Sequence, residues 1–447
     1  MFRPGAAMVL AAMAWCCCAV APAARASEPG VTRVTLGNGL RVVLAPDSLA
    51  TAADVAVWYA SGVRNEKPGF SGMTRLFERL MFRGSATVAD GEHRRRIFSE
   101  GGLANTTTTP DYSCFWETVP GEAVGTALRL EADRMAGLKP SAAALTQERR
   151  AVAEDRRAAS QRTPVARGLA RLYATVFAGQ PYGRPLLGTG AELDRITLRD
   201  IEAWRRERYV PANAVLTVVG RFDEAATLQR IQQWFGAIAK GSVPANMRLT
   251  PATGIRRADE RVEAPARLLF VGWRGPGMDD PDAAAIEVIA RLLGTGENAR
   301  LPLALVSEWK VAIAAQAGCN LHRDASLLWS FAVVPVEADT ATAERLLLDE
   351  VGRLAREAVS EDELEAARRG LETGMLFAQQ STRGRAQALG EAELLTGDVR
   401  HAAARLSAIR ALTVADVQRV AQRVVTEAGR GVVWIAPLPT AEAGGAR

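Results

Sequence analysis

The interpretation of this sequence starts from one stretch, Gly72-Met73-Thr74-Arg75-Leu76-Phe77-Glu78-Arg79-Leu80-Met81-Phe82-Arg83-Gly84-Ser85. Its pattern of apolar residues predicts a helix over residues 72–82. Arg75 and Arg79 are four positions apart, so their side chains lie one above the other on one face of that helix. Glu78 stands between them in the chain. The stretch therefore predicts two guanidinium groups and a carboxylate at a single place in the fold.

This frame has the outline of a zinc-binding motif in which arginine replaces both metal ligands. In the inverted motif His-x-x-Glu-His, the two histidines bind the metal and the glutamate activates water. Here Arg75 and Arg79 occupy the histidine positions, and only Glu78 is retained. A guanidinium group has five N–H donors, no acceptor and a permanent positive charge, so it cannot ligate a dication. The sequence therefore predicts no functional catalytic residue and no bound metal at this place.

The same stretch carries a family resemblance. Gly72 to Ser85 resembles the helix Gly-Leu-Ala-His-Phe-Leu-Glu-His-Met-Leu-Phe-Lys-Gly-Thr of the insulinase/pitrilysin (M16) peptidases, apart from the two ligands. Similar segments follow in the family's order over nearly all of the chain after residue 26: Gly101-Gly102-Leu103-Ala104-Asn105, Asp111-Tyr112, Glu131-Ala132-Asp133-Arg134-Met135, Glu148-Arg149-Arg150-Ala151-Val152, Pro181-Tyr182-Gly183-Arg184-Pro185, Tyr209-Val210-Pro211-Ala212-Asn213-Ala214, Gly294 to Leu301 and Thr413-Val414-Ala415-Asp416-Val417. The chain looks like a member with a degenerate zinc motif, of the non-peptidase subunit type.

The resemblance also implies where a third metal ligand would stand. In the family it is a glutamate seven positions after the position of Glu148, which is Asp155 here, with Glu154 as a competing neighbour. Two interpretations of the arginines stay open. In the first, which we favour, they neutralise Glu78 and Asp155 in a salt-bridge cluster that preserves the fold. In the second, they face outward and bind a carboxylate of a substrate.

A further departure from the family lies in the second half of the chain. Many family members have there an Arg and a Tyr, in a pattern like Arg-Glu-x-x-Gly-Leu-x-Tyr, that help to hold the substrate carbonyl. The corresponding segment is Val306-Ser307-Glu308-Trp309-Lys310-Val311-Ala312-Ile313-Ala314, which has no Tyr and no Arg at the first position. This departure counts against the helper role as well.

The predicted elements indicate an α+β fold with an internal duplication, because two α+β segments of similar length follow each other. With the resemblance, this implies two homologous M16 halves, each a mixed, mainly antiparallel sheet backed by helices, arranged as a clam shell. The expected boundaries are a signal peptide at 1–26, an N-terminal M16 domain at 27–235, a linker at 236–263 and a C-terminal M16 domain at 264–440. Two such chains, or one with a partner, would enclose a chamber.

The resemblance implies a function that depends on backbone pairing. Peptides in this family add as a strand to a sheet edge, which needs no metal. The candidate edge begins with Leu103, Ala104, Asn105 and Thr106 and extends to Thr108. We expect a non-catalytic subunit without a cofactor, whereas active members use zinc, and we expect it to pair with a zinc-bearing M16 peptidase or with itself. The alternatives are a zinc metalloendopeptidase with atypical ligands and a stand-alone peptide-binding or scaffold protein.

The N-terminus predicts export. Residues 1–26 contain Arg3, an apolar stretch from Ala6 to Val20 and Ala24-Arg25-Ala26 before Ser27, which is the pattern of a secretory signal cleaved near Ala26. A lipoprotein anchor at Cys16 is the less favoured alternative, because the residues before it make a poor lipobox. No later segment has a long uncharged apolar run, so no membrane span is expected. The mature chain would be periplasmic or secreted.

Charge and the remaining reactive residues argue against other functional classes. The net charge is +5, or +3 once the two arginines of the leader are removed, and basic residues are mixed with acids along the predicted helices, so nucleic acid is not an expected partner. The only histidines, His93, His322 and His401, are far apart and are predicted to be surface or partly buried polar residues. Cys114 and Cys319 remain after the leader; a disulfide is allowed, but two small buried hydrophobic residues are favoured.

Overall fold

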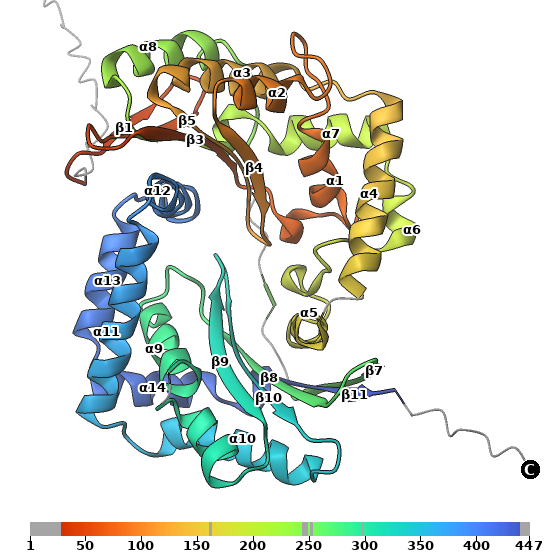
Figure 1. Cartoon of the computed structure of the whole chain (residues 1–447), viewed down its shortest axis with the longest axis vertical. Helices are drawn as coiled ribbons and strands as arrows, with labels where there is room; N and C mark the ends of the chain where they lie inside the picture. Colours follow the sequence, from red (N-terminus) through yellow and green to blue (C-terminus); the bar gives the residue numbers. More distant parts are fainter. Residues whose placement is uncertain (1–27, 161–162, 244–248, 251–253, 297, 439–447) are drawn as a thin grey trace, which may run out of the picture.

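The fold consists of two α+β halves that face each other (Figure 1). The computed structural model describes residues 28–160, 163–243, 249–250, 254–296 and 298–438, so the predicted leader lies outside the described residues. The first half contains β1 (Thr32–Thr35), β2 (Arg41–Pro46), β3 (Ala52–Tyr59), α1 (Met73–Leu80), α2 (Glu92–Ser99), β4 (Leu103–Thr108), β5 (Ser113–Pro120), α3 (Val124–Gly137), α4 (Ala142–Ser160), α5 (Pro164–Val176), α6 (Gly190–Leu193), α7 (Leu198–Arg208), β6 (Ala214–Gly220) and α8 (Glu224–Phe235). The second half contains β7 (Arg256–Val262), β8 (Arg267–Gly275), α9 (Ala283–Gly294), η5 (Pro302–Glu308), β9 (Ala314–Leu321), β10 (Ser326–Val334), α10 (Thr340–Arg356), α11 (Glu361–Ala378), α12 (Thr382–Thr396), α13 (His401–Ala411), α14 (Val414–Val424) and β11 (Arg430–Pro437).

Each half is built on one mixed sheet. Sheet A has the strand order β1-β2-β6-β3-β5-β4, and sheet B has the order β7-β11-β8-β10-β9. Among the described strands each sheet has one parallel pair, β2 with β6 and β7 with β11, and its other pairs are antiparallel. The part of sheet A from β2 to β4 therefore repeats as the whole of sheet B. The predicted duplication and the mixed, mainly antiparallel sheets are confirmed.

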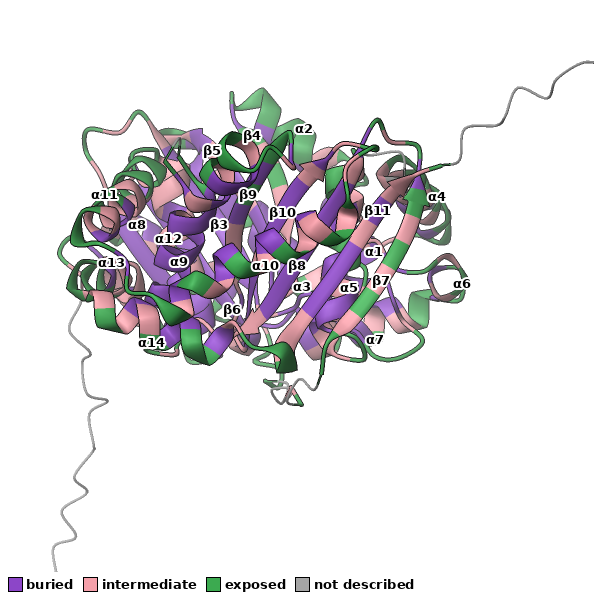
Figure 2. Ribbon diagram, turned by 90° about the horizontal axis from the view of Figure 1, so that it is seen from below, coloured by how far each residue is buried: buried purple, intermediate pink, exposed green. Residues whose placement is uncertain are grey.

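The predicted linker at 236–263 is partly wrong, because strand β7 lies inside it. This strand pairs in parallel with β11 and forms an edge of sheet B, where its residues alternate between half-buried and exposed up to the buried Val262 (Figure 2). Its sequence, Arg-Arg-Ala-Asp-Glu-Arg-Val, has only two apolar residues and so shows no strand signal. Backbone pairing with β11 holds β7 in place, and its two apolar residues, Ala258 and Val262, pack with the buried cluster beneath α5.

Residues Pro302–Glu308 form the π-helix η5, and the chain after it turns at Lys310. Lys310 adopts a φ of 51° and is the only non-glycine residue with positive φ in the described ranges. In the family pattern given above, this position is the glycine, the residue that adopts positive φ without strain. The chain therefore keeps the backbone turn of the pattern while it lacks the residues that give the pattern its chemistry.

Two helices cross from one half to the other (Figure 1). Helix α5 of the first half covers the inner face of sheet B, where Leu172 shares a buried cluster with Phe270 of β8. Helix α12 of the second half covers the inner face of sheet A, where Leu389 shares a buried cluster with Trp58 of β3. The opposite face of each sheet is covered by helices of its own half. Each half therefore depends on the other for one side of its core.

We call α5 and α12 the exchanged helices. A glycine lies where each of them comes nearest to the sheet of the other half. A Cβ on Gly168 of α5 would lie 1.9 Å from the Phe270 ring. A Cβ on Gly390 of α12 would lie 2.3 Å from the Trp58 ring. Both rings are buried. The two halves thus use the same packing solution, in which a helix without a side chain at one position lies directly on an aromatic ring.

The tips of the hairpins β4–β5 and β9–β10 meet in a buried polar cluster that joins the halves. In the first tip, Asp111 accepts hydrogen bonds from Arg64 Nη1 (3.0 Å) and from the Tyr182 hydroxyl (2.6 Å). From the second tip, the backbone N–H of Arg323 donates to Asp111 over 3.2 Å, and His322 Nδ1 lies 3.3 Å from the same carboxylate. Burial alone would raise the pKa of Asp111, but His322, Tyr182 and Arg64 together bring it down to about 2.

We expect Asp111→Asn to weaken the junction between the halves. The folded-state pKa of Asp111, about 2, lies below the ordinary value of 3.8, so its contribution to stability is present above the ordinary value and is lost as the pH falls toward 2. The amide keeps the shape but loses the charge-assisted bond with Arg64, which should lower the free energy of unfolding by about 2 kcal/mol. Urea unfolding at pH 7 measures this loss. An unchanged midpoint would contradict the role assigned to Asp111.

Two further predictions concern membrane-spanning helices and the two cysteines. Within the described residues, the structure contains no helix that combines the length and the apolar character needed to cross a membrane. Cys114 and Cys319 are free thiols in different halves. Cys114 belongs to the buried cluster beneath α12, and Cys319 packs against the core of the second half. Cys114 is thus a small buried residue, as the favoured interpretation predicts, whereas Cys319 is only half-buried.

Candidate functional site

The arginine-bearing helix α1 is fixed at its start by a buried carboxylate. Gly72 at the N-cap has a φ of 94°, and Glu66 accepts hydrogen bonds from the N–H groups of Gly72 (3.0 Å) and Thr74 (2.9 Å). A carboxylate at this end also faces the positive pole of the helix dipole. Burial raises the pKa of Glu66 to about 7, against the lowering effect of these bonds. Leu76 and Phe77 pack into the core, which leaves the arginine-bearing face toward α4 and β4.

Glu78 is buried beneath this face, with an exposed fraction of 3%. The hydroxyls of Thr106 and Thr108 each donate to one of its carboxylate oxygens. These threonines are two positions apart on β4, so both lie on the face of the strand that meets α1. Arg75 Nη1 donates to Glu78 Oε1 over 2.6 Å. The carboxylate that would activate water in the family is here held by three protein donors.

Helix α4 supplies the remaining acids. Glu148 and Asp155 are seven positions apart, so both face α1. Arg75 Nη2 lies 3.0 Å and Arg79 Nη1 lies 3.4 Å from Asp155 Oδ2. Glu148 lies between two arginines, with Oε2 2.5 Å from Arg79 Nε and Oε1 2.6 Å from Arg83 Nε. The result is the α1–α4 ion-pair network, which comprises Arg75, Glu78, Arg79, Arg83, Glu148 and Asp155.

The residues of this network do not fit a zinc ion. Zinc needs ligands with a free lone pair. Of the four positions named by the resemblance, only Glu78 and Asp155 have lone pairs, and both already accept from guanidinium groups. Burial alone would lower the pKa of Arg75, but Glu78 and Asp155 raise it, so a positive charge stays where a dication would lie. We therefore derive no catalytic step through a metal.

The structure brings the four predicted positions together as ion pairs, as the favoured interpretation predicts. Neither arginine faces outward, because the side chains of Arg75 and Arg79 are 27% and 30% exposed and are engaged with acids. The competing residue Glu154 is exposed and lies on another face of α4, beside Gln147 and Arg150. Sequence reasoning missed the part played by Glu148. Its seven-residue spacing from the third ligand position was the signal that could have revealed it.

The predicted peptide edge is the outer strand of sheet A. Within the described chain, β4 pairs only with β5, which leaves its other backbone edge without a neighbouring strand. Leu103 and Asn105 are exposed, whereas Ala104 and Thr106 are partly buried on the side of α1. The strand contains neither proline nor a charged residue, which are the features that commonly block such an edge. An extended peptide that paired with β4 would lie next to the α1–α4 network.

Two of the three histidines are more buried than predicted. His93 and His322 are buried, with exposed fractions of 4% and 8%, so the prediction of surface or partly buried positions is wrong for both. His93 lies 2.9 Å from Glu117, and His322 lies in the junction around Asp111. His401 is half-buried, as predicted. Buried acids hold both buried histidines, and no sequence pattern links these acids to the histidines that they hold.

Two family models match the chain. One, described as Insulinase (Peptidase family M16), covers residues 41–190, and the other, described as Peptidase M16 inactive domain, covers residues 195–371. The chain belongs to the M16 peptidase family. The first match spans the whole α1–α4 network, so this M16 protein carries arginines and acids at the place where the resemblance puts the metal ligands.

Curated relatives of this M16 chain include proteins named as zinc proteases. An uncharacterized zinc protease of Mycobacterium tuberculosis is 26% identical over 91% of this chain and 93% of its own length. The zinc protease PqqE of Helicobacter pylori is 27% identical over 62% of this chain and 64% of its own length. A probable mitochondrial-processing peptidase subunit beta of Arabidopsis thaliana is 25% identical over 92% of this chain and 79% of its own length.

Solved structures share the fold of this M16 chain. A protease from Helicobacter pylori superimposes with a TM-score of 0.85 at 23% identity, over 91% of this chain and 99% of that one. A peptidase M16 inactive domain from Pseudomonas fluorescens gives 0.82 at 17% identity, over 91% and 98%. A chain of complex III2 from Candida albicans gives 0.78 at 19% identity, over 91% and 96%. The α+β fold with two M16 halves is confirmed.

Proposed function

We propose that this M16 chain is a non-catalytic subunit that pairs with a zinc-bearing M16 peptidase and supplies part of a peptide-binding chamber. The α1–α4 network carries this proposal, because ion pairs fill the place at which a peptidase would hold a metal and its activated water. Helices α1 and α4 and strand β4, which surround the network, are all formed. What the chain retains is therefore a shape for holding peptide, and the zinc chemistry would come from the partner.

The unblocked edge of β4 supports peptide binding. An extended peptide that adds to a sheet edge is held by backbone hydrogen bonds, and the neighbouring side chains select its sequence. Leu103 and Asn105 present the exposed side chains of the strand, and Ala104 and Thr106 lie on the side of α1. Two relatives support the pairing with a second subunit, because one is named as a subunit of a processing peptidase and one similar structure belongs to complex III2.

Export is part of the proposal. Residues 1–26 have the pattern of a secretory signal, and cleavage near Ala26 would release a periplasmic or secreted chain. Expressed in a Gram-negative host with its own N-terminus, the protein should appear in the periplasmic fraction with a mass that begins at or next to Ser27. Retention of the full-length mass in the cytoplasm would count against export.

Co-expression tests the pairing. We expect this chain to co-purify with a zinc-bearing M16 homologue encoded near it, and the pair to cleave a quenched fluorescent peptide faster than the homologue alone. Glu78→Gln in this chain should leave that cleavage unchanged, because the proposal gives Glu78 no catalytic role. Leu103→Lys combined with Asn105→Lys should reduce cleavage several-fold, because charges at a strand edge block pairing. Leu49→Lys, at a residue that is 92% exposed, is the matched control.

Each other outcome points to a different function. The absence of both a complex and a change in cleavage would reject the partner role. Peptide binding by the isolated chain would favour a stand-alone binding protein. Stoichiometric zinc in the purified chain, together with chelator-sensitive cleavage that Glu78→Gln abolishes, would show an active peptidase with atypical ligands.

A further inference from the structure

A second polar cluster, separate from the α1–α4 network, lies inside the first half. His93 of α2 and Glu117 of β5 are buried, with exposed fractions of 4% and 0%. Glu131 and Arg134, both of α3, are buried as well, with exposed fractions of 0% and 2%. One ring nitrogen of His93 and one carboxylate oxygen of each glutamate all lie within 4.8 Å of one another. We call these four residues the buried tetrad, and the proposed function does not use them.

The contacts of the tetrad leave two carboxyl groups facing each other. His93 Nε2 lies 2.9 Å from Glu117 Oε1, and Arg134 donates to Glu131. Glu117 and Glu131 each place a carboxylate oxygen within 4.8 Å of a carboxylate oxygen of the other. The Oε2 atom of each has no hydrogen-bond donor among the described residues. Ionised carboxylates only accept hydrogen bonds, so two carboxyl groups this close can bond to each other only if one of them carries a proton.

The charges of the tetrad balance only if one carboxyl group is protonated. Burial and the neighbouring Arg134 lower the pKa of His93 to about 3, so the imidazole is neutral at pH 7. Arg134 then supplies one positive charge against two carboxyl groups. An uncompensated charge in a site with no exposure to water is strongly unfavourable. One proton held between the two glutamates makes the tetrad neutral.

A divalent metal ion fits this balance less well than a proton. Two carboxylates, Arg134 and a dication would leave a net positive charge in the core. The Nε and Nη1 atoms of Arg134 have no acceptor among the described residues, and a cation cannot supply one. The guanidinium group therefore argues against a metal here for the same reason as in the α1–α4 network.

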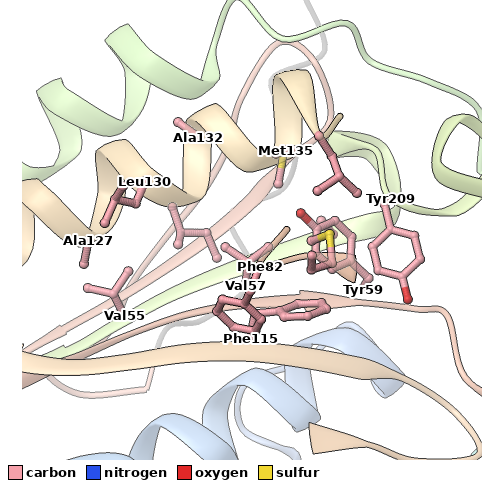
Figure 3. Packing of buried hydrophobic residues seen from close by; sticks show 14 of the residues in the cluster. Val55, Val57, Tyr59, Phe82, Phe115, Ala127, Leu130, Ala132, Met135 and Tyr209 are labelled. Carbon is pink, nitrogen blue, oxygen red and sulfur yellow. The ribbon is translucent and has the colours of Figure 1, made fainter. Parts of the chain in front are cut away.

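We propose that Glu117 and Glu131 share one proton, and that loss of this proton in alkali loosens the packing beneath α1. Phe82, just beyond the end of α1, provides the link, since it lies with Phe115 between α3 and sheet A (Figure 3). The Arg134 guanidinium lies 4.8 Å from the centre of the Phe82 ring and 4.6 Å from that of Phe115. A second negative charge on the glutamates would draw Arg134 away from these rings. The aromatic packing beneath the end of α1 would then loosen.

Other charged and titratable groups lie in electrostatic reach of the tetrad from the neighbouring elements. They are Arg94 of α2, Asp54 and Tyr59 of β3, Cys114 of β5, Asp133 of α3 and Arg383 of α12. Burial raises the pKa of Glu117 to about 7 and that of Glu131 to about 8. Both folded-state values exceed the ordinary 4.5, so the pair's contribution to stability is present in acid and is lost as the pH rises through these values.

Thermal unfolding as a function of pH tests the shared proton. The Tm of the wild-type chain should fall between about pH 4.5 and about pH 8, the range between the ordinary and the folded-state pKa values of the two glutamates, and Glu131→Gln, which keeps the shape without a titrating group, should remove part of that fall. Infrared spectra at pH 7 should show a carboxylic-acid C=O band that weakens in Glu131→Gln. The exposed Glu154→Gln is the matched control and should change neither measurement. Equal pH slopes for wild type and Glu131→Gln, with an unchanged band, would overturn the proposal.

A second measurement keeps the test valid if Glu131→Gln does not fold. Unfolding of the wild-type chain at pH 7 should release protons, because a carboxyl group protonated in the core ionises in water. Calorimetry in two buffers with different ionisation enthalpies measures this release. The absence of a net release would overturn the shared proton. Wild-type protein that carries a stoichiometric metal ion, lost in Glu117→Gln, would replace the proton with a cation and overturn the proposal as well.

Discussion

The double variant Gly168→Ala/Gly390→Ala should lose about 4 kcal/mol of folding free energy, the sum of two distant sites. The new Cβ atoms would lie 1.9 Å from the Phe270 ring and 2.3 Å from the Trp58 ring, so buried rings must move at both sites. Overpacking of this kind destabilises by about 3 kcal/mol per site, and the better helix propensity of alanine offsets about 1 kcal/mol of it. Urea unfolding of each single variant and of the double variant measures the effect.

A glycine in an open position provides the control for this prediction. Gly374 lies in α11, and a Cβ there would have no atom within 4 Å. Gly374→Ala should therefore stabilise the chain by about 1 kcal/mol through helix propensity alone. Substitution of glycine by alanine should therefore destabilise the chain in the exchanged helices and stabilise it in α11. A double variant as stable as the wild type would show that the two helices do not lie against the rings as described.

Restoring histidine to the network should convert a chain without a zinc site into one that binds zinc. In the triple variant Arg75→His/Arg79→His/Asp155→Glu, two imidazoles lie one turn apart on α1 and face a glutamate on α4, which is the ligand set of the family. We expect one zinc ion per chain by elemental analysis, removable with a chelator. Free zinc at 100 times the dissociation constant should raise the free energy of unfolding by about 2.7 kcal/mol.

The control variant separates ligation from the mere loss of positive charge. Arg75→Gln/Arg79→Gln/Asp155→Glu removes both guanidinium groups but supplies no imidazole. It should bind less than a tenth of the zinc that the histidine variant binds. Equal zinc contents in the two variants would show that α1 and α4 do not hold the ligand geometry. Stoichiometric zinc in the wild-type chain would contradict the ion-pair account of the site.

Much of the fold could be predicted because local patterns and the family resemblance agree. The duplication follows from the order of helices and strands along the chain. The edge strand β7 escaped prediction because its charged sequence carries no burial signal, and only its pairing with β11 defines it. The exchange of α5 and α12 between the halves could not be predicted for another reason. An apolar helix face shows that a helix is buried, but it does not show which of two similar sheets it covers.

The site could be predicted where residues share one element and not where distant segments meet. Arg75, Glu78 and Arg79 lie on one helix, so their proximity follows from helical spacing. Thr106 and Thr108 hold Glu78 from a strand that follows later in the chain, and no spacing rule connects them. The junction around Asp111 likewise forms only when two hairpin tips, more than two hundred residues apart in sequence, come together. Such contacts depend on the packed structure.

The exchanged helices also determine when the chain can fold. All strands of sheet A have been synthesised once the ribosome passes β6. The helix that covers the inner face of this sheet, α12, is synthesised only much later. A nascent chain between these points would expose Trp58 and its apolar neighbours to water. Folding must therefore wait until almost the entire polypeptide is available, and chaperones would have to shield the unfinished sheet until then. This order of events is compatible with the export proposed above, in which the chain would cross the membrane before it folds.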